Sequence, residues 1–334
     1  MSQTSHQPLV DRFGRVHTSI RLSVTDRCNI RCYYCMPEVG AKFVSKDRIL
    51  TFEEIDRLAN LFVRRAGVRD IRITGGEPLV RRQLPRLIEM LAAIEGLEDL
   101  SLTTNGVLLA DQAVELRKAG LRRLNISLDT LDEQVFRKIT RRDGLANTLA
   151  GIDAAITCGF DSIKLNTLAI QGVTEPEVAN LVRFALDRGV MLRFIEFMPL
   201  DGDRAWKADQ VLSGDRLLDL MRTAFGDVSP VPRSDPSQPS EEFRIGNGRV
   251  GIIRSVTAPF CGSCNRLRIT ADGAIRNCLF AQSETPIREM MRGGCSDEDL
   301  MKAIQDCLQD KAKAHGIDQD DFRPPERPMY AIGG

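Results

Sequence analysis

The sequence predicts an α/β fold, in which six parallel strands and their helices form an incomplete, TIM-like (β/α)6 barrel. Short aliphatic and β-branched runs recur through the first 200 residues. Each run precedes a segment whose apolar residues repeat at helical spacing, which is the pattern of alternating strands and helices. Polar residues gather directly after the runs, where the loops at the carboxyl ends of barrel strands lie. Units of this kind form parallel sheets with right-handed crossovers.

Helix signals separate the six expected strands. Thr51 with Glu54 predicts a capping box, and apolar residues at helical spacing follow it. Gly67 ends that helix, and Gly120 ends the helix expected over Asp111–Ala119, because glycine adopts the left-handed conformation without strain. The strands are expected near residues Ile20–Thr25, Asp70–Thr74, Leu100–Thr104, Arg123–Leu128, Ser162–Leu168 and Leu192–Phe197.

The pattern changes beyond the sixth strand. Ser229–Ser240 contains four prolines and no apolar periodicity, which predicts a loop or linker. A strand is expected over Arg249–Val256 and a polar helix over Asp297–His315. We therefore expect two domains, residues 1–200 and residues 201–334.

Composition excludes several classes of protein. The 334 residues contain 46 basic and 46 acidic side chains, and Trp206 is the only tryptophan, so neither a basic surface nor an aromatic stacking array predicts a nucleic-acid partner. Met1–Val10 has no apolar signal-peptide core, and no run approaches the roughly 18 apolar residues of a membrane span. We therefore expect a cytoplasmic protein. There, clustered cysteines more often bind metal or react than form disulfides.

Six of the nine cysteines form two incomplete ligand sets. Cys28, Cys32 and Cys35 have CxxxCxxC spacing directly after the first strand. Three thiolates are too few for a tetrahedral zinc site, and they leave one iron of a 4Fe-4S cluster open to a small chelating ligand.

The second set has the spacing Cys261-x2-Cys264-x13-Cys278. A Cys3His zinc site is the alternative here. However, the three histidines, His6, His17 and His315, lie far from this set in the sequence. We expect a second three-cysteine 4Fe-4S cluster, and we expect the remaining cysteines to be ordinary helix or core residues, namely Cys158, Cys295 and Cys307.

The first cysteine set and Gly75–Pro78, a GGEP motif after the second strand, resemble the radical S-adenosylmethionine superfamily. Further motifs narrow the resemblance to the GTP 3′,8-cyclase family of molybdenum cofactor biosynthesis. They are Arg21–Cys28, Cys35–Pro37, Ile73–Pro78, Thr103–Gly106, Arg193–Pro199, Cys261–Arg268 and Ile332–Gly334.

The resemblance implies a role for each candidate site residue. It implies that Cys28, Cys32 and Cys35 hold an N-terminal 4Fe-4S cluster, and that the second cysteine set holds another, in a C-terminal region closing the open side of the barrel. The implied S-adenosylmethionine contacts are Tyr34, Gly76, Ser127 and Met198. The implied GTP contacts are Arg21, Arg72, Thr103, Lys164, Arg193, Arg266, Leu267 and Arg268.

The resemblance also implies the reaction. A 5′-deoxyadenosyl radical abstracts the 3′ hydrogen of GTP, and the ribose radical attacks guanine C8 to give 3′,8-cyclo-GTP. The implied partners are GTP, an external electron donor and a downstream cyclic pyranopterin monophosphate synthase, and we expect a monomer or homodimer. The Gly333–Gly334 tail is expected to thread into the site.

The residues themselves agree with an anionic substrate. Several basic side chains lie on or beside expected barrel strands, where a buried charge is costly unless it is paired. Forked guanidinium groups match phosphate oxygens. Two alternatives remain: a radical S-adenosylmethionine peptide maturase with an auxiliary cluster, and a zinc-binding protein without enzymatic activity.

Overall fold

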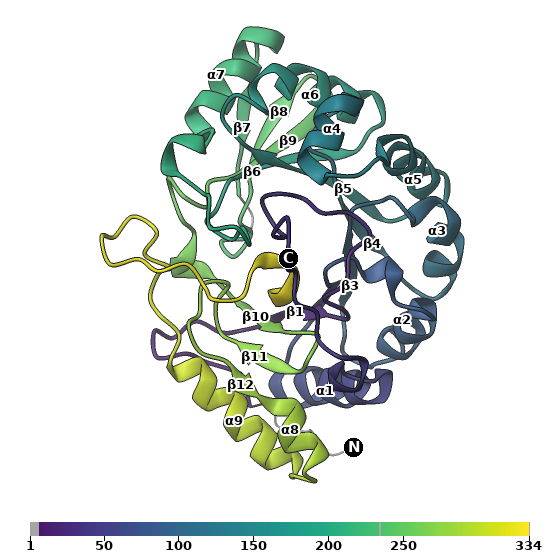
Figure 1. Cartoon of the computed structure of the whole chain (residues 1–334), viewed down its shortest axis with the longest axis vertical. Helices are drawn as coiled ribbons and strands as arrows, with labels where there is room; N and C mark the ends of the chain where they lie inside the picture. Colours follow the sequence, from purple (N-terminus) through teal and green to yellow (C-terminus); the bar gives the residue numbers. More distant parts are fainter. Residues whose placement is uncertain (1–6, 234, 334) are drawn as a thin grey trace.

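All strands in the described part of the chain belong to one sheet. The computed structural model describes residues 7–233 and 235–333. The strand order is β12-β11-β10-β1-β2-β3-β4-β5-β6-β9-β8-β7, and the strands form an open arc with helices on its outer side (Figure 1). The strands are β1 (Ser19–Ser23), β2 (Asp70–Thr74), β3 (Asp99–Thr104), β4 (Arg123–Ser127), β5 (Ser162–Ala169), β6 (Met191–Glu196), β7 (Ser229–Val231), β8 (Glu241–Ile245), β9 (Gly248–Ile253), β10 (Arg266–Ile269), β11 (Ala274–Arg276) and β12 (Thr285–Pro286).

The helices follow the strands in the expected alternation through β6. The longer helices are α1 (Phe52–Ala66), α2 (Leu84–Ala92), α3 (Leu109–Lys118), α4 (Glu133–Thr140), α5 (Leu145–Thr157), α6 (Val178–Asp187), α7 (Gly214–Phe225), α8 (Ile287–Arg292), α9 (Asp297–Gln309) and α10 (Met329–Ile332). The 3-10 helices are η1 (Lys46–Arg48), η2 (Pro78–Val80), η3 (Glu175–Glu177), η4 (Ala208–Gln210) and η5 (Cys261–Ser263).

The predicted incomplete barrel is confirmed. Strands β1 to β6 pair in sequence order, and every pair is parallel. The capping box of Thr51 and Glu54 begins α1, and Gly67 ends it with a φ of 71°. Gly120, with a φ of 102°, follows α3 in the same way. Local sequence signals therefore set these boundaries.

The C-terminal region extends the barrel at both of its open edges. Strand β9 pairs parallel to β6, and β10 pairs parallel to β1, so eight parallel strands line the arc. At both edges the sheet then continues with antiparallel strands. Strands β8 and β7 lie beyond β9, and strands β11 and β12 lie beyond β10. The division between residues 1–200 and 201–334 stays a prediction, although strands from both parts share the sheet.

Two expectations for the C-terminal region were wrong. Ser229–Val231, expected in a loop, forms the edge strand β7, where a proline is tolerated because one side of the strand needs no partner. The helix expected over Asp297–His315 ends at Gln309, because Lys311 turns into the protein interior and is only 2% exposed.

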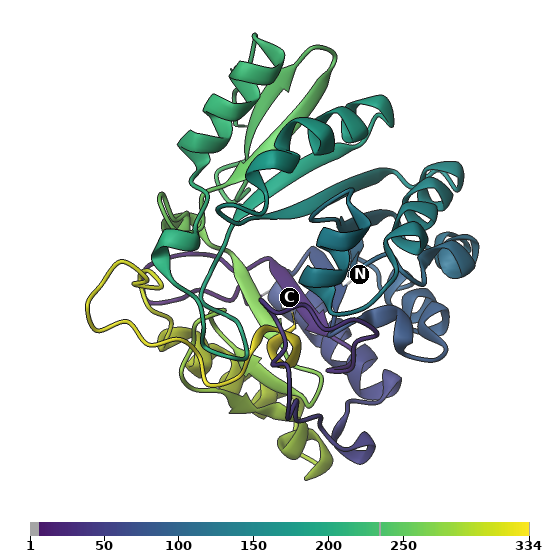
Figure 2. The ribbon, with the colours of Figure 1, turned by 45° about the horizontal axis from the view of Figure 1, so that its top comes forward.

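Alternation along each strand separates an apolar core from a polar interior. In β1, Ile20 and Leu22 are at most 1% exposed and pack in the core with the outer helices. Arg21, between them, faces the inside of the arc and lines a cavity there. The C-terminal helix α10 lies within the arc in both views of the ribbon (Figures 1 and 2). The barrel interior is therefore available for a ligand.

None of the helices in the described residues is long and apolar enough to cross a membrane.

Candidate functional site

A large cavity inside the arc collects almost all of the predicted site residues. Both cysteine sets line it, as do the candidate S-adenosylmethionine contacts and most candidate GTP contacts. The exceptions are Lys164 and Leu267. Leu267 is fully buried in the core, because the alternation of β10 turns its side chain away from the cavity. Gly334 and His6 lie outside the described residues.

The first cysteine set lies on the loop that follows β1. This loop is held to the end of α4, where Arg31 N donates to Thr140 O at 2.8 Å and Tyr33 N donates to Ile139 O at 3.0 Å. Burial and then Glu77 raise the pKa of the Cys28 thiol to about 11. A metal that binds such a thiol replaces its proton, which is released to solvent. Without a metal, the Cys28 side chain is therefore a neutral thiol.

The GGEP turn packs directly against this loop. A Cβ atom on Gly76 would lie 2.5 Å from Arg27 O, and one on Gly75 would lie 2.7 Å from Thr25 O, so both positions require glycine. Glu77 is 1% exposed and accepts hydrogen bonds from Leu79 N, Thr104 Oγ1 and Asn105 N at 2.7 to 3.0 Å. The motif therefore fixes the loops after β1, β2 and β3 relative to one another.

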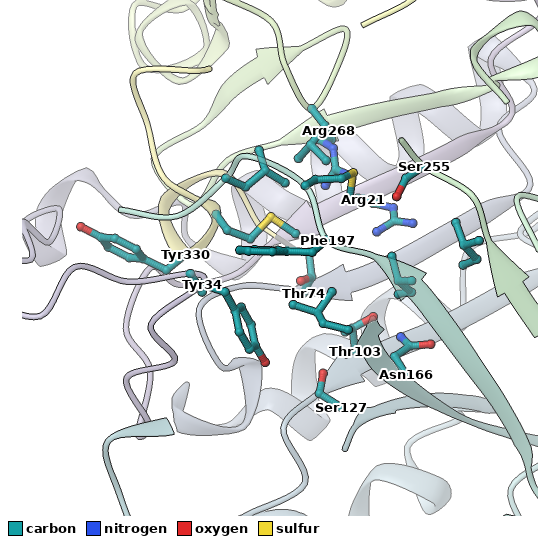
Figure 3. Close-up of a pocket in the computed structure, with 18 of the residues that line it drawn as sticks. Arg21, Tyr34, Thr74, Thr103, Ser127, Asn166, Phe197, Ser255, Arg268 and Tyr330 are labelled. Carbon is teal, nitrogen blue, oxygen red and sulfur yellow. The ribbon is translucent and has the colours of Figure 1, made fainter. Parts of the chain in front are cut away.

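Tyr34 is fixed by a carboxylate that was not among the predicted site residues. Its hydroxyl donates to Asp129 Oδ2 at 2.6 Å, and Leu168 N donates to Asp129 Oδ1 at 2.8 Å. Tyr34 and Ser127 lie on one side of the cavity (Figure 3). Burial raises the pKa of Asp129. The position of Asp129 directly after the fourth strand was the signal that could have found it.

Three arginines form a row across adjacent strands. Arg268 on β10 is the register partner of Arg21 on β1, which is the partner of Arg72 on β2. Arg21 and Arg268 extend into the cavity (Figure 3). Burial, followed by repulsion from Arg268 and Arg72, lowers the pKa of Arg21 well below its ordinary value. Within the described residues, Arg21 makes no hydrogen bond or ion pair of its own, so the row holds cationic charge without a counter-ion.

A second pair of cations lies on β5 and β6. Arg193 donates from Nε to Asn166 Oδ1 at 3.0 Å and from Nη2 to Asn125 Oδ1 at 2.6 Å, which fixes its guanidinium plane. Burial and then Arg193 lower the pKa of Lys164 to about 8. Neither Asn125 nor Asn166 was predicted as a site residue. The only sequence signal for them was their position on the inward face of a strand.

The second cysteine set lies at the opposite end of the barrel from the first. Cys264 comes two residues before the start of β10, and Cys278 comes two residues after the end of the antiparallel strand β11. The Cys28 loop instead follows the end of β1, which runs parallel to β10. Although burial raises the pKa of Cys264, Arg266 and Lys311 lower it to about 7.

The fold brings two histidines close to this set, although the sequence places them far away. His17 Nε2 lies 2.9 Å from Lys311 Nζ, and Lys311 in turn contacts Cys264. His315 lines the cavity, but its Nε2 lies 3.0 Å from Ser255 O and its Nδ1 accepts from Ile317 N at 3.2 Å. Both nitrogens of His315 are therefore engaged and do not serve as a fourth zinc ligand.

The cysteine geometry fits clusters better than single ions. Among the described residues, no three His, Cys, Asp or Glu side chains lie close enough to hold one metal ion. Thiolates of a 4Fe-4S cluster bind different irons and stand further apart than the ligands of one ion. The other cysteines pack in the apolar core, as expected: Cys158, Cys295 and Cys307.

The C-terminal tail reaches the arginine row. Arg268 Nη1 donates to Gly333 O at 2.6 Å. Gly333 has a φ of 90°, and a Cβ atom there would lie 2.8 Å from Ser23 Cβ. A glycine is therefore required at Gly333 for both conformation and space.

Comparisons with solved structures support the fold. A Streptococcus suis protein, SuiB, solved with bound S-adenosylmethionine, matches with a TM-score of 0.59 and 15% identity, covering 93% of this chain and 68% of that protein. The protein anSMEcpe, also solved with S-adenosylmethionine, matches with a TM-score of 0.59 and 16% identity, covering 89% of this chain and 81% of its own.

Comparisons of sequence identify the family. Residues 22–185 match the Radical SAM superfamily, and residues 190–317 match the family described as Molybdenum Cofactor Synthesis C. The GTP 3′,8-cyclase of Rhodopirellula baltica is 64% identical over 330 residues, which cover 98% of this chain and 92% of that protein. The GTP 3′,8-cyclase of Paenarthrobacter nicotinovorans is 44% identical, with 98% and 97% covered. The chain belongs to the GTP 3′,8-cyclase family of the radical S-adenosylmethionine superfamily.

Proposed function

We propose that this chain converts GTP to (8S)-3′,8-cyclo-7,8-dihydroguanosine 5′-triphosphate, the first step of molybdenum cofactor biosynthesis. The observation that carries this proposal is one cavity that joins two three-cysteine sets and a row of arginines that form no ion pair with any described residue. A nucleoside triphosphate carries about four negative charges, which guanidinium groups bind with paired hydrogen bonds. The cavity therefore suits GTP in both charge and lining.

Each cysteine set would hold one 4Fe-4S cluster. Cys28, Cys32 and Cys35 would hold the N-terminal cluster, and the second set, Cys261, Cys264 and Cys278, would hold the C-terminal one. With S-adenosylmethionine bound, the N-terminal cluster supplies the one-electron chemistry that yields a 5′-deoxyadenosyl radical. The protein's task is to bind both molecules, orient them and exclude water.

The S-adenosylmethionine contacts would surround the first cysteine loop. Gly76, in the GGEP turn, offers its backbone without a side chain, and Tyr34 presents a ring fixed by Asp129. Ser127 and Met198 line the same cavity. This arrangement would place the ligand between the loop and the ends of β2 and β4.

The GTP contacts would extend from the arginine row to the second cysteine set. Arg21, Arg72 and Arg268 would bind the triphosphate, with Arg193 and Lys164 approaching from β5 and β6. The Arg266 guanidinium lies over the Phe260 ring, and its buried Nη2 has no hydrogen-bond partner among the described residues, so it could donate to a ligand beside Cys264. Thr103 lines the same cavity. Leu267 would contribute only through its backbone, because its side chain is buried in the core.

The tail would close the site. Helix α10 and Gly333 reach Arg268 and Ser23 at the inner surface of the barrel. A radical must be kept from water and from other hydrogen donors. We propose that the tail, through Gly333, excludes water and holds Arg268 in place. Gly334, which completes the expected tail, lies outside the described residues.

Anaerobic turnover tests the proposed reaction. Reconstituted protein incubated with dithionite, S-adenosylmethionine and GTP should release 5′-deoxyadenosine in proportion to 3′,8-cyclo-GTP, identified by mass spectrometry. Release that does not depend on GTP would reject the cyclase and favour a peptide maturase. About eight irons per chain are expected with both clusters present. Colourless protein with stoichiometric zinc would reject both radical functions.

The finer partner assignments belong to the same proposal. We propose an external one-electron donor, a downstream cyclic pyranopterin monophosphate synthase that consumes the product, and a monomer or homodimer in the cytoplasm. Light scattering of the anaerobic protein tests the oligomeric state, because a stable larger assembly would contradict it.

A further inference from the structure

A buried polar cluster lies behind the second cysteine set. It consists of Asp11, Arg15 and His17 from the N-terminal segment, and Lys311 beyond α9. None of these four residues lines the cavity. Asp11, His17 and Lys311 are at most 4% exposed. The cluster is therefore no part of the substrate-binding surface, and its charges need another explanation.

Lys311 connects this cluster to a cysteine. Its Nζ lies 3.7 Å from Cys264 Sγ, donates to Arg266 O at 2.9 Å and lies 2.9 Å from His17 Nε2. An ammonium group has three hydrogens and no acceptor. All three donors are thus assigned, and one of them is directed at the cysteine sulfur.

His17 serves Lys311 as a neutral acceptor. His17 Nδ1 lies 3.0 Å from Arg15 O, so Nδ1 carries the proton and donates it to that carbonyl. The lone pair on Nε2 is then free to accept from Lys311. Burial, followed by the charge of Lys311, lowers the pKa of His17 to about 4, in agreement with a neutral ring. His17 therefore orients the ammonium without neutralising it.

The nearby carboxylate does not neutralise Lys311 either. Asp11 Oδ2 pairs with Arg15 Nε at 2.6 Å, and Asp11 Oδ1 accepts from Phe13 N and Arg15 N. Among the described residues, Lys311 has no ion pair with a carboxylate. An uncompensated buried ammonium is costly. Burial lowers the pKa of Lys311, and the charges that oppose this shift are those of the Cys264 and Cys278 thiolates.

We propose that Lys311 is a positioning residue of the C-terminal cluster, which donates a hydrogen bond to the Cys264 thiolate and compensates the cluster's negative charge. This inference rests on the proposed function, since it needs a cluster on the second cysteine set. Reduction adds one negative charge to a cluster, and a fixed cation or a hydrogen bond to a ligand sulfur stabilises the reduced form. Lys311 therefore raises the reduction potential of that cluster.

The test isolates the C-terminal 4Fe-4S cluster and measures its reduction potential. Replacing Cys28, Cys32 and Cys35 by alanine removes the N-terminal cluster, and the parent for all comparisons is this triple variant. Lys311→Met keeps the length of the side chain and removes its charge. Lys313→Gln is the matched control, because Lys313 is two residues away but exposed. Potentials are measured by anaerobic redox titration followed by electron paramagnetic resonance.

Lys311→Met should shift the reduction equilibrium at least tenfold toward the oxidised form, which is about 59 mV to more negative potential for one electron. Lys313→Gln should leave the potential unchanged. A Lys311→Met variant with parent iron content and parent potential would overturn the proposal. A merely structural lysine would change the unfolding temperature without moving the potential.

Lys311→Arg covers the case in which Lys311→Met does not retain iron. Retained iron and a parent-like potential in Lys311→Arg would then support the need for a cation. Loss of iron from both variants would make the position a packing requirement and overturn the proposal. The iron content of the parent triple variant tests the proposed function separately from the role of Lys311. If this variant binds fewer than about four irons per chain, the second cysteine set holds no 4Fe-4S cluster and the proposed function fails.

Discussion

Replacing Arg21 by methionine should stabilise the substrate-free protein while weakening its binding of GTP. Arg21 lies between Arg268 and Arg72 in adjacent strands and has no hydrogen bond or ion pair in the described part of the chain. Strands lie about 5 Å apart, so each neighbouring like charge costs about 3 kcal/mol at an effective dielectric constant of about 20. Because Arg21 is partly accessible to water, we discount the total to about 1–3 kcal/mol.

This gain corresponds to an unfolding temperature higher by about 2 to 8 °C. Losing a charge-assisted hydrogen bond to phosphate costs about 1.5–3 kcal/mol, so GTP should bind about 10- to 100-fold more weakly. Both quantities are measured on anaerobic, reconstituted protein without S-adenosylmethionine. Thermal unfolding gives the stability, and titration calorimetry gives the affinity for GTP.

Arg123→Met is the matched control for this experiment. Arg123 also belongs to the inward face of the barrel, but it forms an ion pair with Asp99 at 2.7 Å. Its removal leaves Asp99 without its partner, so the unfolding temperature should fall. A lower unfolding temperature for Arg21→Met together with unchanged GTP affinity would refute the reasoning, because Arg21 would then be a structural residue.

Three further substitutions test other parts of the site. Gly76→Ala should lower stability and abolish S-adenosylmethionine binding, because the new methyl group would lie 2.5 Å from Arg27 O. Titration calorimetry that gives the wild-type affinity for S-adenosylmethionine would contradict this. Since burial and then Arg193 lower the pKa of Lys164 to about 8, its cation is lost as pH rises through that value. The KM for GTP should therefore rise above pH 8, and Lys164→Arg should flatten that rise; identical profiles would count against the contact. Gly333→Ala should reduce kcat at unchanged iron content, since φ is 90° there, and an unaffected kcat would exclude a role for the tail.

Most of the correctly predicted helix and strand boundaries rest on local sequence signals. The capping box at Thr51 and the glycine at Gly67 need only neighbouring residues, and both occur where they were expected. The pairing of β9 with β6 and of β10 with β1 joins segments far apart in the chain, which periodicity does not encode. Pro230 misled the prediction, because a proline fits an edge strand as well as a loop.

The same distinction between local and long-range signals applies to the residues of the candidate site. Cysteine spacing grouped the two candidate ligand sets because the members of each lie close in sequence, and all six cysteines line one cavity. Asn125 and Asn166 were missed because their role depends on Arg193, which reaches them only after three strands pair. Lys311 was missed because it fell inside the helix expected over Asp297–His315, which ends at Gln309. Residues that orient other residues are visible only in three dimensions.

Strand direction explains how one cavity would accommodate the two proposed clusters and a nucleotide. Ser19, at the start of β1, is the register partner of Arg266, two residues after Cys264. Cys28 follows the opposite end of β1, so the two cysteine sets adjoin opposite ends of that strand. Its four steps span on the order of 13 Å. Arg21 lies midway along this span. A substrate that contacts both the second cysteine set and the arginine row would therefore need its negative charge near the middle of β1. A nucleoside triphosphate would meet this requirement with its base directed to the second cysteine set and its triphosphate bound at the row, which leaves the first cysteine set to S-adenosylmethionine, as proposed above.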